Sequence, residues 1–565
     1  MGAGWLALLA GLALWLQTPT PELREQLKSY QFWSLEVCLV LTLTLGGLTL
    51  RALCRELQRR DVSRLAVLTA ITLALTLLVA PRTNRIYYDE HIYQAIGHNL
   101  SDARLAQMCN DGVVEYGRLQ CWIGEYNKQP YAYPHLLSVV YRVFGVSTGA
   151  AFALNAVVNA LTVCGVYLLV LTLFADRTAA LLAGLLMALI PQQVLWSATA
   201  AVEPSASLAC IVALLCAASY LQSRSTVALA ATAAATVYAV QFRPESLLIV
   251  PVVGLLLSSS FGLEELRRPK IWALGLFALA LAGVHIGHMA AVRNEGWGAS
   301  DARLSLAYVI PNIRVNGGFY LADSRFPLIV TLLAVVGLLG RSFRSERRVF
   351  VAYFFAFFGI YLLFYAGSYN YGADVRYSLM TYPPIAILGG LGASAIAAWL
   401  DRVSTAFTGR RAVTIVVLAQ FLLYAPVVRA TTEEAWAARA DVRFAESLVP
   451  DLRGNSYVLT HNPGMFHLWG VNAGQMSLLV TNQRQVELLA LRYAGGVYLH
   501  WNFWCNVDDP VQQIFCRKAI EGRSLDLVRE YRERDQRFAL YRFRTAPLHA
   551  LNLGERPMLD LRAER

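Results

Sequence analysis

The chain has 565 residues and a net charge of +11, with 56% hydrophobic and only 15% charged side chains. Soluble domains carry about 25% charged residues, so this composition excludes an ordinary soluble enzyme, a disordered chain and a coiled coil. The positive charge does not indicate nucleic-acid binding, because most of it lies in short segments between long apolar runs. That distribution is typical of a membrane protein that keeps its basic loops in the cytoplasm.

Thirteen apolar runs are predicted to form transmembrane helices. In chain order they cover residues 2–17, 33–50, 65–80, 149–175, 178–196, 203–222, 225–242, 246–261, 271–291, 326–340, 349–367, 378–400 and 412–428. Several are shorter than the ~20 residues that a span needs. The sequence therefore predicts a mainly α, polytopic membrane module over residues 1–428. The first basic residue is Arg24, so no secretory signal peptide is expected at its start.

Basic residues set the expected orientation of this module. The segments 51–64, 176–177, 223–224, 262–270, 341–348 and 401–411 contain 17 Arg and Lys against 7 Asp and Glu. The positive-inside rule places these segments in the cytoplasm together with the N-terminus. The segments predicted to lie outside are then 81–134, 292–325, 368–377 and everything after 428.

The first outer loop, 81–134, begins with two adjacent carboxylates, Asp89 and Glu90. Adjacent carboxylates at a membrane surface cost desolvation and mutual repulsion unless something uses them. The apolar spacing after Glu90 predicts a helix, and a helix N-terminus favours ionised acids. Two interpretations stay open here: acids that cap the helix, or a functional acid.

The same loop ends on Lys128, which lies among aromatic residues and prolines before an amphipathic stretch at 136–144. A lysine in that setting is either an interfacial anchor or a ligand for a lipid phosphate at the headgroup level. Both interpretations put Lys128 at the outer membrane surface.

Further candidates for an anion site follow in the later outer segments. Arg376 borders the bilayer on the side opposite to the basic loops, which suggests an anionic partner; the alternative is an ion pair with Asp374. Arg243 and Arg293 are weaker candidates. His285 and His288 lack a third ligand, which favours hydrogen bonding in the core over metal binding.

Residues 429–565 contain no apolar run of spanning length and are predicted to form a soluble α/β domain. Short β-type runs are expected at 456–461, 477–481, 496–501 and 537–543. Four of the nine cysteines fall on the predicted outer side as two close pairs, Cys109 with Cys121 and Cys505 with Cys516. Pairs in an oxidising compartment predict two disulfides, and four free thiols are the alternative.

In this order, these residues resemble the polyprenyl-phosphate-sugar-dependent glycosyltransferases of the GT-C fold, in particular the protein O-mannosyltransferases and the lipid A aminoarabinose transferases. The resemblance covers roughly residues 81–428. It rests on Asp89-Glu90, Lys128-x-Pro130, Glu203-Pro204, Arg243-Pro244-Glu245 and Arg376-Tyr377. It departs from the family in two places. The family's loop usually follows the first span, whereas two further spans precede that span here, and Gln129 stands where many relatives have a proline.

The resemblance implies an inverting transfer of a sugar from an outward-facing polyprenyl-phosphate carrier. The acceptor would be a hydroxyl, or a phosphate, of a cell-envelope lipid, glycan or protein. Asp89 would act as general base, and Glu90 would position the acceptor or tune Asp89. Arg376 and Lys128 would bind the donor phosphate. The other predicted substrate-binding residues are Tyr377, His91, Tyr88, Tyr131, Tyr133, Arg243 and Arg293.

No cofactor is expected beyond the lipid-linked sugar donor, although a divalent ion beside Asp89, Glu90 and His91 stays an open alternative. The expected partners are membrane lipids, the donor and the acceptor, with no nucleic acid. Only four of the 49 basic residues are lysine, which is typical of a GC-rich bacterial genome. We therefore expect a bacterial inner membrane protein with its site and its C-terminal domain in the periplasm.

Three other functions compete with this interpretation. A flippase for lipid-linked sugars would use charges within the membrane and internal repeats, whereas the charges here gather near the outer surface. A non-enzymatic assembly or receptor protein would act through residues 429–565. A glycan ligase or polymerase would share the lipid carrier without depending on Asp89.

Overall fold

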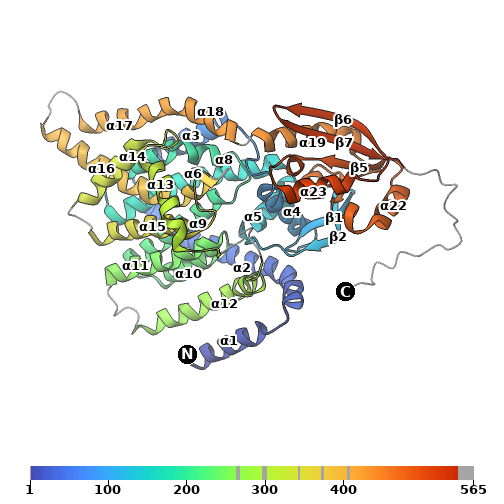
Figure 1. Cartoon of the computed structure of the whole chain (residues 1–565). Coiled ribbons are helices and arrows are strands. Elements are labelled where there is room, and N and C mark those ends of the chain that lie inside the picture. The colour runs from blue at the N-terminus through green and yellow to red at the C-terminus, as the bar shows by residue number, and fades with distance from the viewer. Residues whose placement is uncertain are drawn as a thin grey trace.

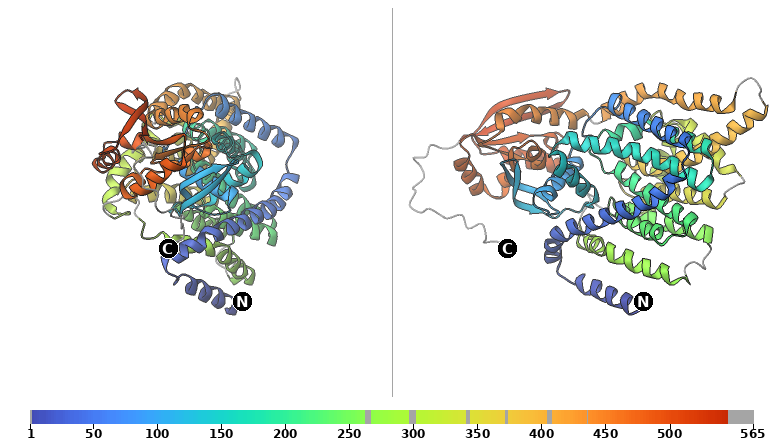
Figure 2. Two further views of the ribbon diagram at one scale, coloured as in Figure 1. Left: turned by 90° about the vertical axis from the view of Figure 1, so that its right-hand side faces the viewer. Right: turned by 180° about the vertical axis from the view of Figure 1, so that it is seen from behind.

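The structure is a computed structural model that describes residues 2–261, 267–295, 302–340, 344–370, 374–403, 408–434 and 436–544. A bundle of long helices forms one part, and a seven-stranded sheet with its own helices forms the other (Figure 1). The views from the side and from behind show the sheet at one end of the bundle (Figure 2).

The bundle is built from the apolar runs. Its elements are α1 (Gly2–Trp15), α2 (Thr20–Arg55), α3 (Arg59–Leu78), α6 (Thr148–Phe174), α7 (Arg177–Leu189), α8 (Pro191–Ser197), α9 (Glu203–Ser223), α10 (Thr226–Val240), η1 (Pro244–Leu248), α11 (Ile249–Phe261), α12 (Pro269–Ala291), η3 (Leu306–Tyr308), α13 (Val309–Leu321), α14 (Leu328–Leu339), α15 (Arg344–Leu363), η4 (Asp374–Thr381), α16 (Tyr382–Val403), α17 (Gly409–Ala419), η5 (Gln420–Leu423) and α18 (Tyr424–Glu434).

All thirteen predicted runs are mainly helical. Within the described part of the chain, six helices are long and apolar enough to cross a membrane, and a seventh span results if α7 and α8 are counted together. These two helices are bent by 61° because Pro191 opens α8, and proline removes a backbone donor and disfavours helix in the residue before it. The chain is thus a mainly helical membrane protein, while the count of thirteen spans stays a prediction.

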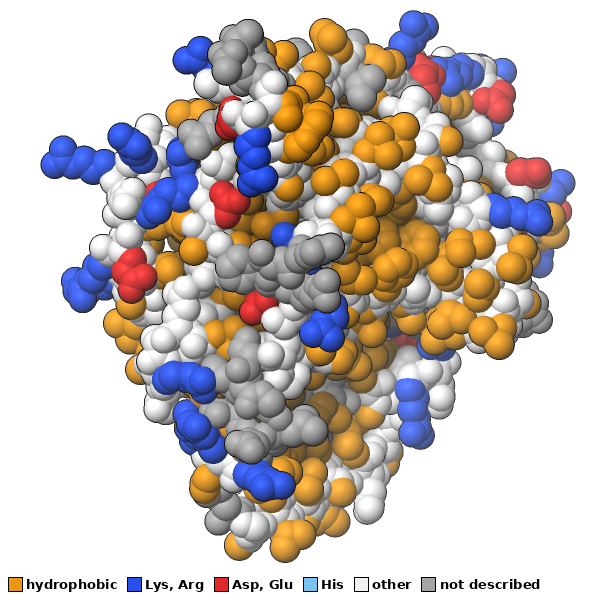
Figure 3. All heavy atoms as spheres, turned by 90° about the vertical axis from the view of Figure 1, so that its left-hand side faces the viewer, with side chains coloured by type: hydrophobic (Ala, Val, Ile, Leu, Met, Phe, Trp, Pro, Cys, Tyr) orange, Lys and Arg blue, Asp and Glu red, His pale blue; other side chains and the backbone are white. Residues whose placement is uncertain are grey.

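A buried ion pair joins two of the basic segments at one end of the bundle. Asp61 is fully buried and accepts from Arg177 Nε at 3.1 Å, while Arg64 Nη1 donates to the Arg177 carbonyl at 3.2 Å. Lys and Arg side chains stand out around the end of the bundle that faces away from the sheet (Figure 3). Parts of the basic segments 262–270, 341–348 and 401–411 lie outside the described residues.

The sheet has the strand order β2-β1-β4-β3-β5-β7-β6. β3 is parallel to β4 and to β5, and the other neighbours are antiparallel. The strands are β1 (Met108–Glu115), β2 (Arg118–Glu125), β3 (Ser456–Thr460), β4 (Asn472–Gln475), β5 (Gly496–Trp501), β6 (Leu525–Glu533) and β7 (Gln536–Phe543). The associated helices are α4 (Asp89–Asp102), α5 (Ala132–Phe144), α19 (Trp436–Leu452), α20 (Pro463–Leu468), α21 (Leu478–Thr481), α22 (Gln483–Arg492), η6 (Phe503–Cys505) and α23 (Pro510–Ile520).

Three of the four expected β-type runs contain strands, and the prediction for 477–481 is wrong, because Leu478–Thr481 is helical. A run of a few apolar residues is too short for its periodicity to distinguish a strand from a helix. Both predicted disulfides are formed. The Cys109–Cys121 bridge joins β1 to β2, and the Cys505–Cys516 bridge joins η6 to α23.

The sheet draws strands from both sides of the expected boundary at residue 428. The β1–β2 hairpin belongs to the outer loop 81–134, and it pairs with β4 at Asp111–Gly474 and Gly112–Ala473. Helix α4 packs on α20 so closely that a Cβ on Gly464 would lie 2.6 Å from the Cβ of Ala95. Residues after 428 therefore hold the loop that carries Asp89, and the division at 428 stays a prediction.

Candidate active site

Helix α4 begins with Asp89 and Glu90, and its geometry sends the two carboxylates in different directions. Adjacent helical residues are about 100° apart around the axis. Glu90 is fully buried and accepts hydrogen bonds from the backbone N–H groups of Arg85, Ile86 and Ala200 at 2.7–2.9 Å. Asp89 keeps 24% of its side chain exposed and lines a cavity. Glu90 thus ties the start of α4 to the segment before α9, whereas Asp89 is accessible.

The cavity has a volume of about 560 Å³ and lies where the segments predicted to be outside the membrane meet the bundle. Its lining comes from α4, the segment after β2, the α10–η1 junction, the end of α12, the loop before η3, α15 and η4. The lining residues are Asp89, Tyr93, Lys128, Gln129, Arg243, Pro244, Glu245, Leu247, Leu248, Met289, Val292, Arg293, Arg303, Leu304, Ile360, Tyr361, Phe364, Tyr365, Ala366, Arg376 and Tyr377.

Asp89 stands at one end of a chain of charged groups. Asp89 Oδ2 accepts from Nη1 and Nη2 of Arg376, both at 3.1 Å. The Nε atom of Arg376 lies 3.4 Å from Oε1 of Glu203, which is fully buried. Arg243 also bonds to Glu203, and on its other side to Glu245. Because each acid lies against a guanidinium, the two arginines are held rigidly at the cavity wall.

The lining combines positive charge with hydrocarbon. Five basic side chains face two acidic ones, Asp89 and Glu245, among the described residues of the lining. The apolar share comes from Leu247, Leu248, Met289, Val292, Leu304, Ile360 and Phe364. A cavity of this composition suits an amphiphile with an anionic group at one end and an apolar chain at the other.

Six of the predicted site residues lie in this lining: Asp89, Lys128, Arg243, Arg293, Arg376 and Tyr377. Five others do not: Glu90, His91, Tyr88, Tyr131 and Tyr133. The sequence interpretation did not assign Tyr93, Glu245 or Tyr361 to the site, nor Glu203 behind it. Glu203 and Glu245 are each adjacent to a proline in segments already noted for the resemblance, and the local sequence holds no further sign of their roles.

The structure shows what holds the predicted residues outside the lining. His91 Nδ1 donates to the Tyr87 carbonyl and its Nε2 accepts from Asn84, while burial lowers the pKa of His91 to about 4, so the ring is neutral. The Tyr131 hydroxyl donates to the Asn127 carbonyl and accepts from its N–H, which shapes the turn before Lys128. Tyr133 is fully buried with its ring 5.7 Å from that of Tyr93.

The histidines of α12 support the same turn. His288 Nδ1 is hydrogen-bonded to the Tyr126 hydroxyl at 2.8 Å, and its ring packs edge-on against Tyr131. This arrangement agrees with the expectation that His288 makes hydrogen bonds in the core, while His285 is buried with its ring stacked on that of His288. It also holds the segment that carries Lys128 against the bundle.

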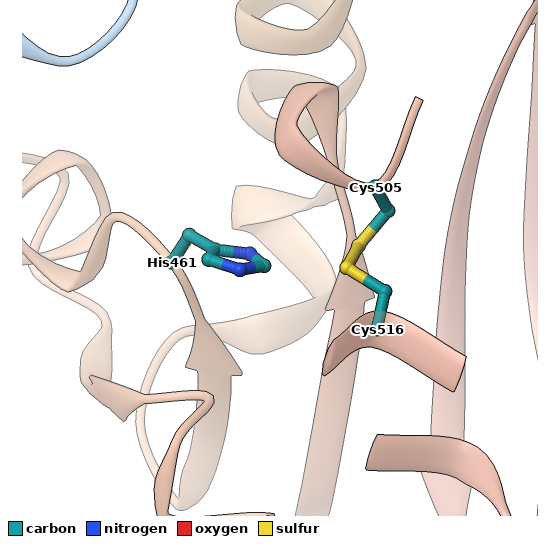
Figure 4. Close-up of side chains that lie close together, drawn as sticks. All are labelled: His461, Cys505 and Cys516. Carbon is teal, nitrogen blue, oxygen red and sulfur yellow. A yellow bond between two sulfur atoms is a disulfide. The ribbon is translucent and has the colours of Figure 1, made fainter. Parts of the chain in front are cut away.

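One group of potential metal ligands occurs among the described residues. His461, Cys505 and Cys516 lie together with their ligand atoms within 4.8 Å of one another. The two sulfur atoms are joined in a disulfide that faces the imidazole (Figure 4), and a metal requires free thiolates. Asp89, Glu90 and His91 do not converge, because Glu90 and His91 are bonded to backbone and amide groups away from the cavity.

The helical bundle has the GT-C glycosyltransferase fold, and its cavity at one end is lined by acids and arginines. Residues 128–288 match the family model for dolichyl-phosphate-mannose-protein mannosyltransferases. Two crystal structures of ArnT from Cupriavidus metallidurans are similar to most of this chain, one in the apo state and one bound to undecaprenyl phosphate. Their TM-scores are 0.52 and 0.50 at 14% and 15% identity, and each comparison covers 84% of this chain and 97% of ArnT. No curated protein matches the sequence.

These comparisons confirm the predicted resemblance and the predicted fold class. At 14–15% identity the likeness to ArnT establishes the fold, and the family match covers the segment from Lys128 to His288. The enzyme class expected from the sequence, a glycosyltransferase, agrees with both findings.

Glu90 leads to a prediction about stability and pH. Burial raises the pKa of Glu90 to about 7, despite its backbone hydrogen bonds. Between about pH 4.5 and 7 the folded chain keeps a proton on Glu90 that the unfolded chain loses. The free energy of unfolding therefore falls as pH rises through this window, by about 3 kcal/mol at most.

We expect Glu90→Gln to remove this dependence of the free energy of unfolding on pH, measured by unfolding in detergent at pH 4.5, 6 and 8. Glu446→Gln on the exposed side of α19 is the control, and an unchanged slope in Glu90→Gln would contradict the assignment.

Tyr87 connects the start of α4 to the core of the C-terminal part. Its side chain is 3% exposed and lies among residues of α19 and β3, with its ring 5.2 Å from that of Phe503. Its carbonyl accepts from Asn462 Nδ2 at 3.3 Å. The Asp441 carboxylate adds to burial in raising the pKa of Tyr87. Tyr87 is therefore a positioning residue for Asp89, two residues later.

Removing this anchor is expected to impair catalysis without weakening donor binding. Because a displacement of about 1 Å at a reacting group costs up to 100-fold in rate, we expect Tyr87→Ala to lower kcat at least tenfold and to leave KM for the donor nearly unchanged. Tyr87→Phe keeps the packing and should restore most of the rate. The measurement is steady-state kinetics on folded protein, and equal changes in kcat for both variants would argue against packing as the cause.

Proposed function

We propose that this chain is an inverting membrane glycosyltransferase that takes a sugar from a polyprenyl-phosphate carrier and transfers it to a hydroxyl, or a phosphate, of a cell-envelope acceptor. The observation that carries the proposal is the contact between Asp89 and Arg376 at the wall of a cavity whose lining combines basic and apolar side chains. The ArnT structure bound to undecaprenyl phosphate supports this class of ligand.

The cationic side chains bind the leaving group in this proposal. A phosphate diester carries one negative charge, and a second develops on the phosphate oxygen as the bond to the sugar breaks. Arg376 and Lys128 stabilise this charge most when it is fully formed, which lowers the barrier. Arg243 holds Glu203 and so keeps Arg376 in place, and the apolar lining takes the first part of the polyprenyl chain.

Asp89 acts on the acceptor. It accepts the proton of the acceptor hydroxyl as the acceptor oxygen bonds to the anomeric carbon. The bond between that carbon and the phosphate oxygen breaks, and the polyprenyl phosphate leaves with the electron pair. A single displacement from the opposite face inverts the anomeric configuration. Glu90 does not take part directly; it fixes the first turn of α4.

The same arrangement supports a proposed location. The segments 81–134, 292–325 and 368–377 all contribute to the cavity or to the sheet, and the Arg-rich segments at Arg64 and Arg177 meet elsewhere. We propose that the cavity faces the periplasm of a bacterial inner membrane, with residues 1–428 as the membrane module and 429–565 as its outer domain.

The test is turnover of a panel of polyprenyl-phosphate sugars by the full chain in nanodiscs, with an envelope fraction as acceptor. Mass spectrometry of the lipid fraction should show one donor converted to free polyprenyl phosphate, and NMR of the product should show the inverted anomer. If no donor is consumed while donor moves between the leaflets of proteoliposomes, the chain is a flippase and the proposal is wrong.

A further inference from the structure

We infer that the acceptor is a saccharide and that it binds outside the cavity, beside Asp89, on a patch formed by Tyr88, Asn110, Glu125, Gln475 and Trp504. We call this surface the aromatic–amide patch. The inference rests on the proposed transferase function and adds the chemical class of the acceptor.

Two aromatic rings form the apolar part of the patch. Tyr88 precedes α4, and Trp504 lies in η6 of the C-terminal part. Their ring centroids are 6.1 Å apart with an angle of 86° between the planes, and both side chains are half-buried. Large rings with a partly accessible face present a flat apolar surface at low entropic cost. The apolar C–H face of a sugar ring is complementary to such a surface.

Amide and carboxylate groups lie next to these rings. Asn110 Nδ2 donates to Glu125 Oε2 at 2.7 Å, and Gln475 Nε2 donates to Asn110 Oδ1 at 3.3 Å. Gln475 is also hydrogen-bonded to the Tyr88 hydroxyl, while burial and the carboxylates of Glu125 and Asp89 raise the pKa of Tyr88 to about 12. Sugar hydroxyls both donate and accept, so a row of amides and a carboxylate can bind several of them.

The patch and the cavity are joined through two short segments of chain. Tyr88 is followed by Asp89, and Glu125 is followed within three residues by Lys128, which lines the cavity with Gln129. Asp89 therefore lies between the donor cavity and the patch. A single displacement requires the acceptor oxygen to approach from the face opposite to the leaving phosphate. The donor phosphate and its chain fill the cavity side, so the acceptor comes from the patch side.

The composition of the patch distinguishes between the acceptor classes. Its five residues include one carboxylate and no basic side chain, which disfavours a phosphate acceptor. Glu125 is exposed and the other four residues are half-buried, in contrast to Tyr87 one residue earlier, which is buried in the core of the C-terminal part.

The experiment uses the full chain in nanodiscs and the envelope fraction of the source organism. The donor is the polyprenyl-phosphate sugar that the panel experiment identifies, with its sugar radiolabelled. The new linkage is identified by methylation analysis and mass spectrometry, and lipid extraction separates a free glycan from a glycolipid headgroup. The second measurement is the ratio of sugar transfer to donor hydrolysis by water, compared between wild type, Trp504→Ala and Trp122→Ala. Trp122 carries the Arg492 guanidinium over its ring, makes none of the contacts described for the patch, and serves as the matched control.

A glycosidic bond between two sugars is the expected linkage, and Trp504→Ala is expected to lower the ratio of transfer to hydrolysis at least about tenfold, while Trp122→Ala leaves the ratio unchanged. A linkage to Ser, Thr, a phosphate or a lipid alcohol overturns the inference. An unchanged ratio in Trp504→Ala overturns it as well, even if the linkage joins two sugars. If wild type consumes no donor at all, the proposed function fails and the inference fails with it; donor consumption with the wrong linkage refutes the inference alone.

Discussion

Asp89→Asn is expected to reduce sugar transfer by a factor of ~100 or more, because the amide cannot accept the proton of the acceptor hydroxyl. The replacement is nearly isosteric, and it removes the negative charge that competes with the donor phosphate for Arg376. Donor affinity should therefore be retained or improved. The initial rate of polyprenyl phosphate release measures the transfer, and a binding titration with the donor measures the affinity.

Two comparisons make this prediction specific. Asp508→Asn changes an exposed aspartate in the C-terminal part and should behave like wild type. Glu90→Gln is expected to alter stability more than chemistry, because Glu90 is bonded to backbone N–H groups and has no access to the cavity. Transfer by Asp89→Asn at the rate of wild type would refute Asp89 as the base and would favour a ligase or polymerase with a different base.

Arg376→Ala is expected to lower kcat/KM for the donor by a factor of roughly 100 to 1000, the usual effect of removing one group that stabilises developing charge. Arg376 is 9% exposed in its side chain and lies between Asp89 and Glu203, so its guanidinium presents a fixed donor array to the phosphate. Arg376→Lys keeps the charge but loses the planar array, and we expect it to recover only part of the loss.

A fold defect must be separated from a binding defect in this experiment. Removing Arg376 leaves Glu203 paired with Arg243 alone, which is expected to lower the unfolding temperature. Arg376→Ala combined with Glu203→Gln removes both charges and should recover stability without recovering activity. Arg118→Ala at the exposed turn of the β1–β2 hairpin is the control. Recovery of full activity in the double variant would show that Arg376 has a structural role only.

Much of the fold could be predicted from the sequence because its signals are local. Long apolar runs form helices wherever the membrane leaves no other partner for the backbone, and each predicted run is mainly helical. The members of each cysteine pair are close in sequence, and both pairs form disulfides. The segment 477–481 is predicted as a strand but is helical at Leu478–Thr481, because three apolar residues are too few to show a period.

The candidate site was predictable only in part. Asp89, Lys128 and Arg376 stand out because charged residues at the outer ends of apolar runs are costly unless they are used. The sequence places two adjacent acids, Asp89 and Glu90, at the start of one helix and does not indicate which is accessible. The helix geometry in the folded chain leaves Asp89 accessible and buries Glu90. Tyr131 and Tyr133 lie in an aromatic segment of the kind that often binds ligands, yet Tyr131 shapes the turn before Lys128 and Tyr133 packs against Tyr93.

The sequence by itself determined the membrane class, the helical runs, the cysteine pairs and several of the acids and arginines that line the cavity. The tertiary structure alone decided which acid faces the cavity, that Glu203 lies between Arg376 and Arg243, and that the β1–β2 hairpin joins a sheet built mainly after residue 428. The physical reason is the range of the interactions. Hydrophobicity and helix periodicity act within a few turns of chain, whereas ion pairs and strand pairings join residues that are far apart in sequence and depend on how the helices pack.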